Sequence, residues 1–200
     1  MKRAFLLDRD GTVSREVGYV NHPSRLVLLP RTAEAIRQAR AAGYLCVLVT
    51  NQAGVARGYF SEDLVHATHT VLEEQLADHD TALDGIYYCP HHPSAGEPPY
   101  RADCRCRKPR PGMLLQAAAD LDIELARSVV VGDKISDVEM AHSQGARGIL
   151  VRTGYGLGEE VYGQAKWTTR PDHIADDLLD AVRWVLEIDD PRRGGREEPS

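Results

Sequence analysis

Three apolar runs that each lead to a polar residue constrain the fold of this chain more than any other feature. The runs cover residues 4–7, 44–49 and 129–131, and they lead to Asp8, Thr50 and Asp133. Continuous apolar segments of this length are typical of parallel strands that are covered on both faces. Segments with helical apolar spacing separate the runs, so strands and helices alternate. The pattern predicts an α/β fold with a single Rossmann-like, doubly wound parallel sheet.

The other elements follow from apolar spacing and capping residues. Helices are expected at 30–43, from 61, from 111, at 136–145 and at 172–188, and further strands at 83–88 and 148–151. The irregular segment 13–30 is expected to form a flap over the first strand end. His66 and His69 lie in the second helix with no third ligand nearby, so we interpret both as solvated helix positions.

The spacing of these elements also bounds the domain. One helix, one strand and a loop already fill each interval between the polar strand ends. No separate inserted domain that would cover, or cap, these strand ends therefore fits. We predict one capless domain over residues 1–188, which includes a metal-binding loop at 89–107. Residues 189–200 contain Pro, Gly and mixed charge, and this composition predicts a disordered tail.

Composition restricts the partners of the chain. Of its 200 residues 42% are hydrophobic and 27% are charged, and the formal net charge is −6. These values are typical of a soluble globular protein, and the negative charge argues against a nucleic-acid surface. The first apolar run ends at Asp8, far too early for a signal peptide or a membrane span. We expect a cytoplasmic protein with no membrane partner.

Polar residues at the strand ends are expected to converge, because the carboxyl ends of parallel strands meet at one edge of the sheet. Asp8 and Asp10 can then divide the roles of nucleophile and acid/base. Asp8, Asp133 and the carbonyl of Asp10 are oxygen ligands that suit Mg²⁺, while Thr50 and Lys108 can hold phosphoryl oxygens. The alternative for Asp8 and Asp10 alone is a solvated turn after a strand.

A second metal site is indicated by three of the four cysteines. Cys89, His91, Cys104 and Cys106 form a C-x-H and a C-x-C pair within a Pro-rich loop, a set that suits tetrahedral Zn²⁺. Four protein ligands leave no open position, so the zinc is expected to be structural. His92 is an alternative to His91, and a disulfide is the rival interpretation of the cysteines. The loop leads directly into Arg107 and Lys108.

Together these motifs resemble those of the haloacid dehalogenase superfamily of phosphotransferases. The resemblance rests on the segments 8–12 and 131–134, on the strand-terminal Thr50 and on Lys108 before a helix. It implies attack on phosphorus by Asp8, an aspartyl-phosphate intermediate and its hydrolysis by water that Asp10 activates. It also implies that Thr50 and Lys108 hold the phosphoryl group and that Asp133 binds Mg²⁺.

A narrower resemblance covers nearly the whole chain to about residue 186. Segments 18–20, 50–52, 54–58, 87–93 and 104–109 are similar to those of the D-glycero-D-manno-heptose-1,7-bisphosphate phosphatases. This implies an enzyme of carbohydrate metabolism that removes the C7 phosphate of a sugar bisphosphate. We expect the protein to be a monomer. The implied substrate contacts are Arg9, Glu16, Gly18, Tyr19, Asn51, Gln52, Arg107 and Lys134. One departure is Glu16-Val17, where relatives often carry an Asp-His pair.

Other functions are compatible with parts of the pattern. Histidinol-phosphate phosphatases share the zinc loop, and polynucleotide 3′-phosphatases share a similar first motif and Thr-Asn-Gln. The acidic charge and the lack of a G-x-x-x-x-G-K-[ST] segment argue against the polynucleotide enzyme. A zinc-stabilised scaffold that binds phosphate without turnover is a further alternative, against which the intact pair Asp8 and Asp10 argues.

Overall fold

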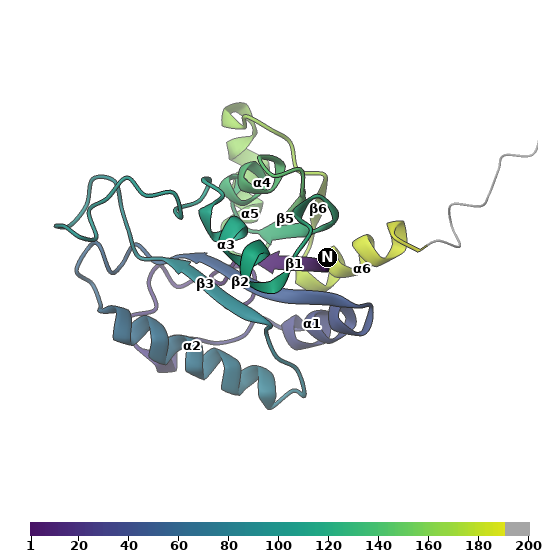
Figure 1. The fold of residues 1–200 in the computed structure, drawn as a ribbon, viewed down its shortest axis with the longest axis horizontal. Helices are drawn as coiled ribbons and strands as arrows, with labels where there is room; N and C mark the ends of the chain where they lie inside the picture. Colours follow the sequence, from purple (N-terminus) through teal and green to yellow (C-terminus); the bar gives the residue numbers. More distant parts are fainter. Residues whose placement is uncertain (191–200) are drawn as a thin grey trace, which may run out of the picture.

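A six-stranded parallel sheet forms the centre of the molecule (Figure 1). The computed structural model describes residues 1–190, and within this range every strand belongs to the one sheet, in the order β3-β2-β1-β4-β5-β6. The strands are β1 (Arg3–Leu7), β2 (Tyr44–Asn51), β3 (Gly85–Cys89), β4 (Val129–Gly132), β5 (Arg147–Val151) and β6 (His173–Ala175). The predicted α/β fold with a single parallel sheet is confirmed.

Helices cover both faces of the sheet, which makes the fold doubly wound. Side chains alternate along each strand, so that Phe5 and Leu7 pack on one face while Ala4 and Leu6 pack on the other. The first face is covered by α1 (Thr32–Ala41), α2 (Glu62–Ala77) and α6 (Leu178–Ile188), and the second by α3 (Gly112–Leu121) and α4 (Ile135–His142). The continuous apolar runs of the sequence reflect this double coverage.

The strand order places β1 at the point where the chain reverses the direction in which it adds strands to the sheet. The chain adds β2 and β3 on one side of β1 and then returns to add β4 on its other side. Leu7 pairs with both Leu48 and Val131, so Asp8, Thr50 and Asp133 follow these aligned residues by only one or two positions. The side chains that follow them therefore meet at one place, where open α/β sheets bind ligands.

The C-terminal region differs from its prediction. The helix expected at 172–188 begins only at Leu178, after an N-cap at Asp177, and the residues before it form β6 against β5. Three residues are too few to show a strand period, which explains the error. Asp189, placed in the predicted tail, ends α6 and pairs with Arg3 and Arg147. The rest of that predicted tail, residues 191–200, lies outside the described residues.

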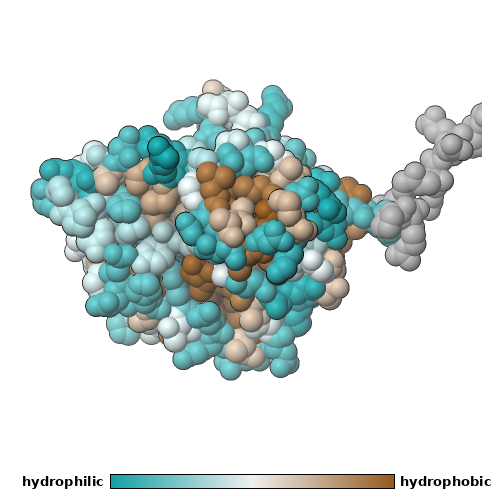
Figure 2. Space-filling model, viewed as in Figure 1, coloured by the Kyte–Doolittle hydropathy of each residue, from teal (hydrophilic) through white to brown (hydrophobic). Residues whose placement is uncertain are grey.

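The loops and short helical turns complete the fold. The flap at 13–30 contains a single 3-10 turn, Pro23–Arg25, and the segment after β5 winds through a short helix, α5 (Gly156–Gly158), and further turns up to Lys166. Within residues 1–190 no helix combines the length and the apolar character that crossing a membrane requires. The surface in Figure 2 is mostly hydrophilic, with apolar patches between polar side chains.

Candidate active site

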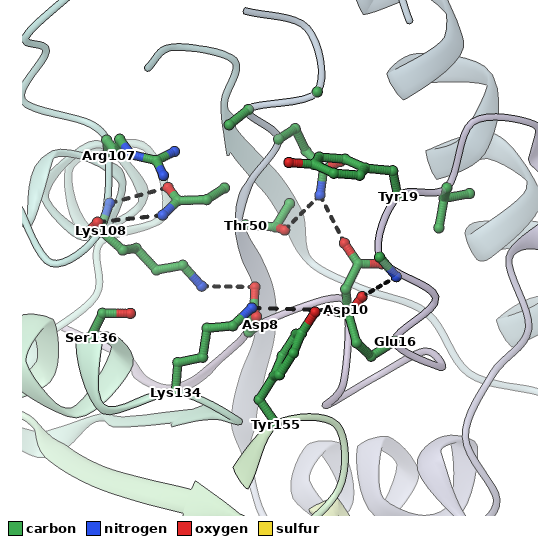
Figure 3. Close-up of a pocket in the computed structure, with 16 residues that line it drawn as sticks. Asp8, Asp10, Glu16, Tyr19, Thr50, Arg107, Lys108, Lys134, Ser136 and Tyr155 are labelled. Atoms are coloured by element: carbon green, nitrogen blue, oxygen red, sulfur yellow. Dashed lines mark hydrogen bonds and ion pairs between the residues drawn. The ribbon is translucent and has the colours of Figure 1, made fainter. Parts of the chain in front are cut away.

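A polar cavity of about 390 Å³ opens at the carboxyl ends of β1 and β2. Figure 3 shows the side chains around it, with Asp8 at the centre and Lys108, Lys134 and Asp10 on different sides. Every predicted catalytic and substrate-binding residue except Arg9 lines this cavity, and so do Ser136 and Tyr155. The structure thus brings together residues that are up to 147 positions apart, from Asp8 to Tyr155.

Lys108 joins two buried carboxylates at the base of the cavity. Its Nζ lies 2.7 Å from Asp8 Oδ1 and 2.6 Å from Asp137 Oδ1, and it also donates to the carbonyl of Val49 at 3.1 Å. Burial acts to lower the pKa of Lys108, but the charges of Asp137 and Asp8 outweigh it and raise the pKa above its ordinary value. Lys108 is therefore a fixed cation beside the predicted nucleophile.

The carboxylates around Asp8 outnumber the cations that are buried with them. Oxygens of Asp8, Asp133 and Asp137 lie within 4.8 Å of one another. Among the described residues Asp133 Oδ1 has no hydrogen-bond partner, and Lys134 Nζ is 3.9 Å away. Burial and then the charge of Asp8 raise the pKa of Asp133 to about 7. A buried carboxylate oxygen that has no hydrogen bond and faces a second carboxylate is a donor that suits a hard divalent cation.

Asp133 and Asp137 have different roles in this cluster. Both oxygens of Asp137 are engaged, because Oδ1 accepts from Lys108 and Oδ2 accepts from the backbone N–H of Lys134 at 3.3 Å. Asp133 Oδ2 accepts from the N–H of Tyr155 at 2.9 Å, which leaves Oδ1 for a cation. Of these two residues, Asp133 is therefore the better candidate ligand. Asp137 was interpreted from the sequence only as a helix cap, and its place beside Lys108 was missed.

Two glycines allow the backbone to approach Asp133. A Cβ atom on Gly11 would lie 2.1 Å from Asp133 Oδ2, and one on Gly154 would lie 2.2 Å from the same oxygen. Both residues have positive φ angles, 87° and 57°, which other residues rarely adopt. Thr153 Oγ1 donates to the carbonyl of Gly11 at 2.6 Å and joins the two loops. The turn after Asp10 is thus shaped around Asp133.

Asp10 belongs to a hydrogen-bonded network on the α2 side of the cavity. Arg9 contacts both of its oxygens, Nε to Oδ1 at 3.1 Å and Nη2 to Oδ2 at 2.8 Å. Gln52 Nε2 donates to Asp10 Oδ2 at 3.0 Å and to Thr50 Oγ1 at 2.9 Å. Arg9 is 1% exposed and is not among the described residues that line the cavity. The predicted substrate contact of Arg9 is therefore corrected: its guanidinium holds Asp10 instead.

The rim of the cavity carries groups of both charges. Lys134 Nζ lies 4.4 Å from the centre of the Tyr155 ring and 4.0 Å from Glu16 Oε2. Glu16 accepts from the backbone N–H of Gly18 at 2.5 Å, which fixes the flap, and burial raises its pKa with a further contribution from Asp10. Figure 3 shows Arg107 on the rim beside Lys108, on the far side of Asp8 from Tyr19.

The second ligand set converges in the loop after β3. The sulfurs of Cys89, Cys104 and Cys106 are 3.2–3.5 Å apart, and His91 Nδ1 lies 3.5 Å from Cys106 Sγ. These separations are slightly shorter than the edge of about 3.8 Å expected for a tetrahedron with Zn–S bonds of about 2.3 Å. All four cysteines of the described chain are free, so the disulfide interpretation is wrong. Arg107 Nη1 donates to the carbonyl of His91 at 3.2 Å.

His92 does not point at the sulfur cluster. Its Nδ1 accepts from the backbone N–H groups of Ser94 and Ala95 at 3.2 and 3.0 Å, and its Nε2 lies 3.1 Å from Arg57 Nη2. Both ring nitrogens are therefore engaged elsewhere. Of the two histidines that the sequence offers, His91 is the one placed to complete a four-ligand set.

Comparisons with known proteins agree with this geometry. The family model of the haloacid dehalogenase-like hydrolases matches residues 3–142, and a second model of such hydrolases matches residues 105–181. The D-glycero-D-manno-heptose-1,7-bisphosphate 7-phosphatase of Thermosynechococcus vestitus is 44% identical, over 94% of this chain and 98% of its own. The D-glycero-β-D-manno-heptose-1,7-bisphosphate 7-phosphatase of Haemophilus influenzae is 42% identical, over 94% of this chain and 99% of its own. The chain belongs to this heptose-bisphosphate phosphatase family of haloacid dehalogenase-like hydrolases.

A solved structure of the heptose-bisphosphate phosphatase family has the same fold. The D,D-heptose 1,7-bisphosphate phosphatase from B. bronchiseptica, complexed with magnesium and phosphate, is 32% identical and covers 93% of this chain and 99% of its own, with a TM-score of 0.81. Haloacid dehalogenase-like phosphatases use Mg²⁺.

One further residue near the cavity differs from its prediction. His69, expected to be solvated, is 5% exposed, and its Nε2 lies 3.3 Å from Arg9 Nη1. It lies four residues after Val65 and three before Leu72, on the apolar stripe of α2, and this spacing was the available signal. His66, by contrast, is exposed as predicted.

Proposed function

We propose that the chain is a Mg²⁺-dependent phosphatase that removes the C7 phosphate of D-glycero-D-manno-heptose 1,7-bisphosphate and leaves the 1-phosphate. The observation that carries the proposal is the pairing of Asp8 and Lys108 at 2.7 Å beneath a polar cavity whose wall contains Asp10. A carboxylate nucleophile, a fixed cation and a second carboxyl group are the parts that phosphoryl transfer through an aspartyl phosphate requires. The names of the relatives supply the substrate.

The reaction divides into two displacements on phosphorus. In the first, an Asp8 oxygen attacks the C7 phosphorus while the bond to the sugar oxygen breaks, and Asp10 gives that oxygen its proton. In the second, Asp10 takes a proton from water, the water oxygen attacks the phosphorus, and the bond to Asp8 breaks to release phosphate. Lys108 and Thr50 hold phosphoryl oxygens in both steps, since Lys108 already contacts Asp8 and Thr50 lies across the cavity (Figure 3).

The Mg²⁺ is proposed to be held by Asp8, by Asp133 and by the carbonyl of Asp10. The ion supplies positive charge that offsets the charge on the phosphoryl oxygens and on the carboxylates. Asp137 supports this set indirectly, because its ion pair at 2.6 Å keeps Lys108 in place. Gly11 and Gly154 leave Asp133 the space it occupies.

The second phosphate of the substrate is proposed to lie at the rim. Arg107 and Lys134 are cations on the cavity wall. Lys134 Nζ lies 3.9 and 4.0 Å from its carboxylate neighbours, whereas Lys108 is bound between two carboxylates at 2.6–2.7 Å. Asn51 and Gln52, with Glu16, Gly18 and Tyr19 of the flap, complete the proposed sugar contacts. Asn51 Oδ1 accepts from the N–H of Lys108 at 3.1 Å, so it also fixes the lysine backbone.

A structural Zn²⁺ at Cys89, His91, Cys104 and Cys106 completes the proposal. Three sulfurs and one imidazole nitrogen already converge, and these soft ligands suit zinc better than magnesium. The ion would order the loop that ends at Arg107 and Lys108. One protomer supplies all of these proposed ligands, and a monomer stays the prediction for the assembly.

The decisive experiment is a phosphate-release assay with Mg²⁺. Each anomer of heptose 1,7-bisphosphate is compared with histidinol phosphate and with a short 3′-phosphorylated DNA, and ³¹P NMR identifies the remaining phosphate. We expect turnover of the bisphosphate with the phosphate retained at C1. Preferred turnover of histidinol phosphate or DNA, or a product phosphorylated at C7, would contradict the proposal.

A further inference from the structure

A buried histidine on α2 contacts the arginine that holds Asp10. His69 Nε2 lies 3.3 Å from Arg9 Nη1, and both side chains are almost fully buried. The guanidinium of arginine has only donors, so Nε2 must accept and the ring proton must be on Nδ1. His69 is thus placed as a neutral acceptor behind the active site, and neither proposed step of the reaction uses it.

The guanidinium of Arg9 is held on three edges. Two of its N–H groups form a bidentate pair with Asp10, a third donates to Gln52 Oε1 at 2.9 Å, and Nη1 meets His69. Bidentate pairs fix orientation as well as distance, so the plane of the guanidinium sets the plane of the Asp10 carboxylate. Gln52 touches the same Asp10 oxygen, whereas His69 contacts Arg9 from the opposite end.

We propose that His69 is a positioning residue, which holds the Arg9 guanidinium and through it fixes the Asp10 carboxyl for proton transfer to the leaving sugar oxygen. This inference rests on the proposed function, in which Asp10 is the acid. Burial and the charge of Arg9 lower the pKa of His69 to about 3, so the ring stays an acceptor at neutral pH. Proton transfer depends on the geometry of hydrogen bonding, and small displacements reduce it strongly.

His69 is itself held from the side of the predicted metal-binding loop at 89–107, called the cysteine loop below. Its ring meets the ring of Tyr88 with centroids 5.7 Å apart at 63°. The Tyr88 hydroxyl donates to Glu62 Oε2 at 2.6 Å, and Tyr100, in the loop between the cysteine pairs, donates to Glu62 Oε1 at 2.8 Å. Contacts therefore run without interruption from the loop to Asp10, and they preorganise His69 before substrate binds.

The test compares two leaving groups in the Mg²⁺-loaded enzyme. The sugar oxygen of heptose bisphosphate needs a proton to leave, whereas the phenolate of p-nitrophenyl phosphate leaves without one. Replacing His69→Phe keeps an aromatic ring but removes the acceptor. We expect kcat/KM for the bisphosphate to fall about 10- to 100-fold, and that for p-nitrophenyl phosphate to fall less than about threefold. Because kcat/KM covers only the steps up to loss of the leaving group, the second displacement does not mask the difference.

Two further variants separate positioning from general damage. His69→Gln offers an oxygen that can reach Arg9, and His69→Asn is one methylene shorter, so we expect Gln to restore bisphosphate turnover and Asn to fail. This pair decides the question if His69→Phe does not fold, as judged by circular dichroism. His66→Phe is the matched control, since His66 lies one turn earlier on α2 and meets Tyr88 instead of Arg9. It should leave both substrates unaffected.

The possible outcomes are distinct. Equal losses on the two substrates, or equal activity of the Gln and Asn variants, would overturn the role of His69 while leaving the phosphatase proposal intact. A wild-type protein without activity on any phosphate ester would instead overturn the proposed function, and this inference with it.

Discussion

The molecule contains two clusters of metal-type ligands that differ in almost every physical respect. Asp8 and Asp133 follow the ends of β1 and β4, and Asp137 lies in the first turn of α4. All three are buried, and one oxygen of Asp133 has no hydrogen-bond partner among the described residues. The cysteine loop instead brings three ligands against Cys89, the last residue of β3, and two of its cysteines are only half-buried. The carboxylate cluster borders a cavity that substrate can enter, whereas no ligand of the loop lines it.

The difference teaches what each cluster contributes. Hard oxygen ligands with few partners leave positions for water and phosphate, so a cation there takes part in chemistry. Four soft ligands close a tetrahedral site, so a cation there can only stabilise the loop. Changes to the carboxylate cluster should therefore lower turnover at constant stability, and changes to the cysteine loop should do the reverse.

The largest effect is expected for Asp8→Asn. The change removes the nucleophilic oxygen and one proposed ligand while it preserves size and the strand end. Turnover of heptose bisphosphate should fall by at least about 10⁴-fold, as for loss of other catalytic residues. Steady-state kinetics measures this loss, and thermal unfolding should show a melting temperature close to that of the wild type. Near wild-type turnover in the presence of Mg²⁺ would exclude a covalent mechanism.

The next effect compares two glycines that share a backbone conformation. Gly11 and Gly43 have φ angles of 87° and 83°, so alanine is strained at both and should lower the free energy of unfolding by about 1 kcal/mol. At Gly11 the added Cβ would also fall on Asp133 Oδ2, whereas at Gly43 it meets no described atom within 4 Å.

Only Gly11→Ala should therefore disturb the magnesium site. We expect its turnover to fall about 100-fold and its half-saturating Mg²⁺ concentration to rise about tenfold or more. Gly43→Ala should keep both values. Equal kinetics of the two variants in a Mg²⁺ titration would show that Asp133 does not need the space beside Gly11.

The features that the sequence predicted correctly are those with a local signal. Apolar runs predicted five of the six strands, and the polar residues after them predicted a common edge of the sheet. The helix expected from 61 begins at Glu62, directly after Ser61, whose Oγ accepts from the N–H of Leu64. Spacing also indicated that Cys89, Cys104 and Cys106 group with His91 or His92, and the structure brings His91 to the three cysteines.

The features that were missed depend on contacts between distant elements. Arg9 alternates with Asp8 and Asp10, and nothing local reveals that its guanidinium turns away from the cavity to meet His69, 60 residues later. Asp137 accepts from the N-cap backbone of α4, which begins at Ile135, close to the start expected at 136. Its pairing with Lys108 exists only because α4 and the cysteine loop meet at the sheet edge. Such pairings are set by tertiary packing, which a single sequence does not display.

For the cysteine loop, the expected loss is in stability rather than in turnover. Cys104→Ser, or removal of zinc by a chelator, should lower the free energy of unfolding by about 2–4 kcal/mol, because the Pro-rich loop has no core of its own. Calorimetry and elemental analysis measure the stability and the zinc content. Cys46→Ser is the control, since Cys46 is buried in β2 away from the cluster and should leave the zinc content unchanged. Protein purified without chelator and found to lack zinc would contradict this prediction.

The smallest effect is expected for Arg107, a residue of the cysteine loop that also lines the cavity. Arg107 follows the last ligand of the loop, donates to the carbonyl of His91 and lines the cavity, so the loop delivers this cation to the rim. If it binds the outer phosphate, Arg107→Ala should lower kcat/KM for heptose bisphosphate about 10- to 100-fold, as expected for loss of a charge-assisted contact.

A small monophosphate such as acetyl phosphate has no second phosphate that could contact Arg107. Its kcat/KM should therefore change little in Arg107→Ala. Arg105→Ala provides the control, because Arg105 is in the same loop but is not among the described residues that line the cavity. Equal losses on both substrates would assign Arg107 to the catalytic phosphate instead. The loop would then act on the chemistry itself, and the division between the two clusters would fail at this residue.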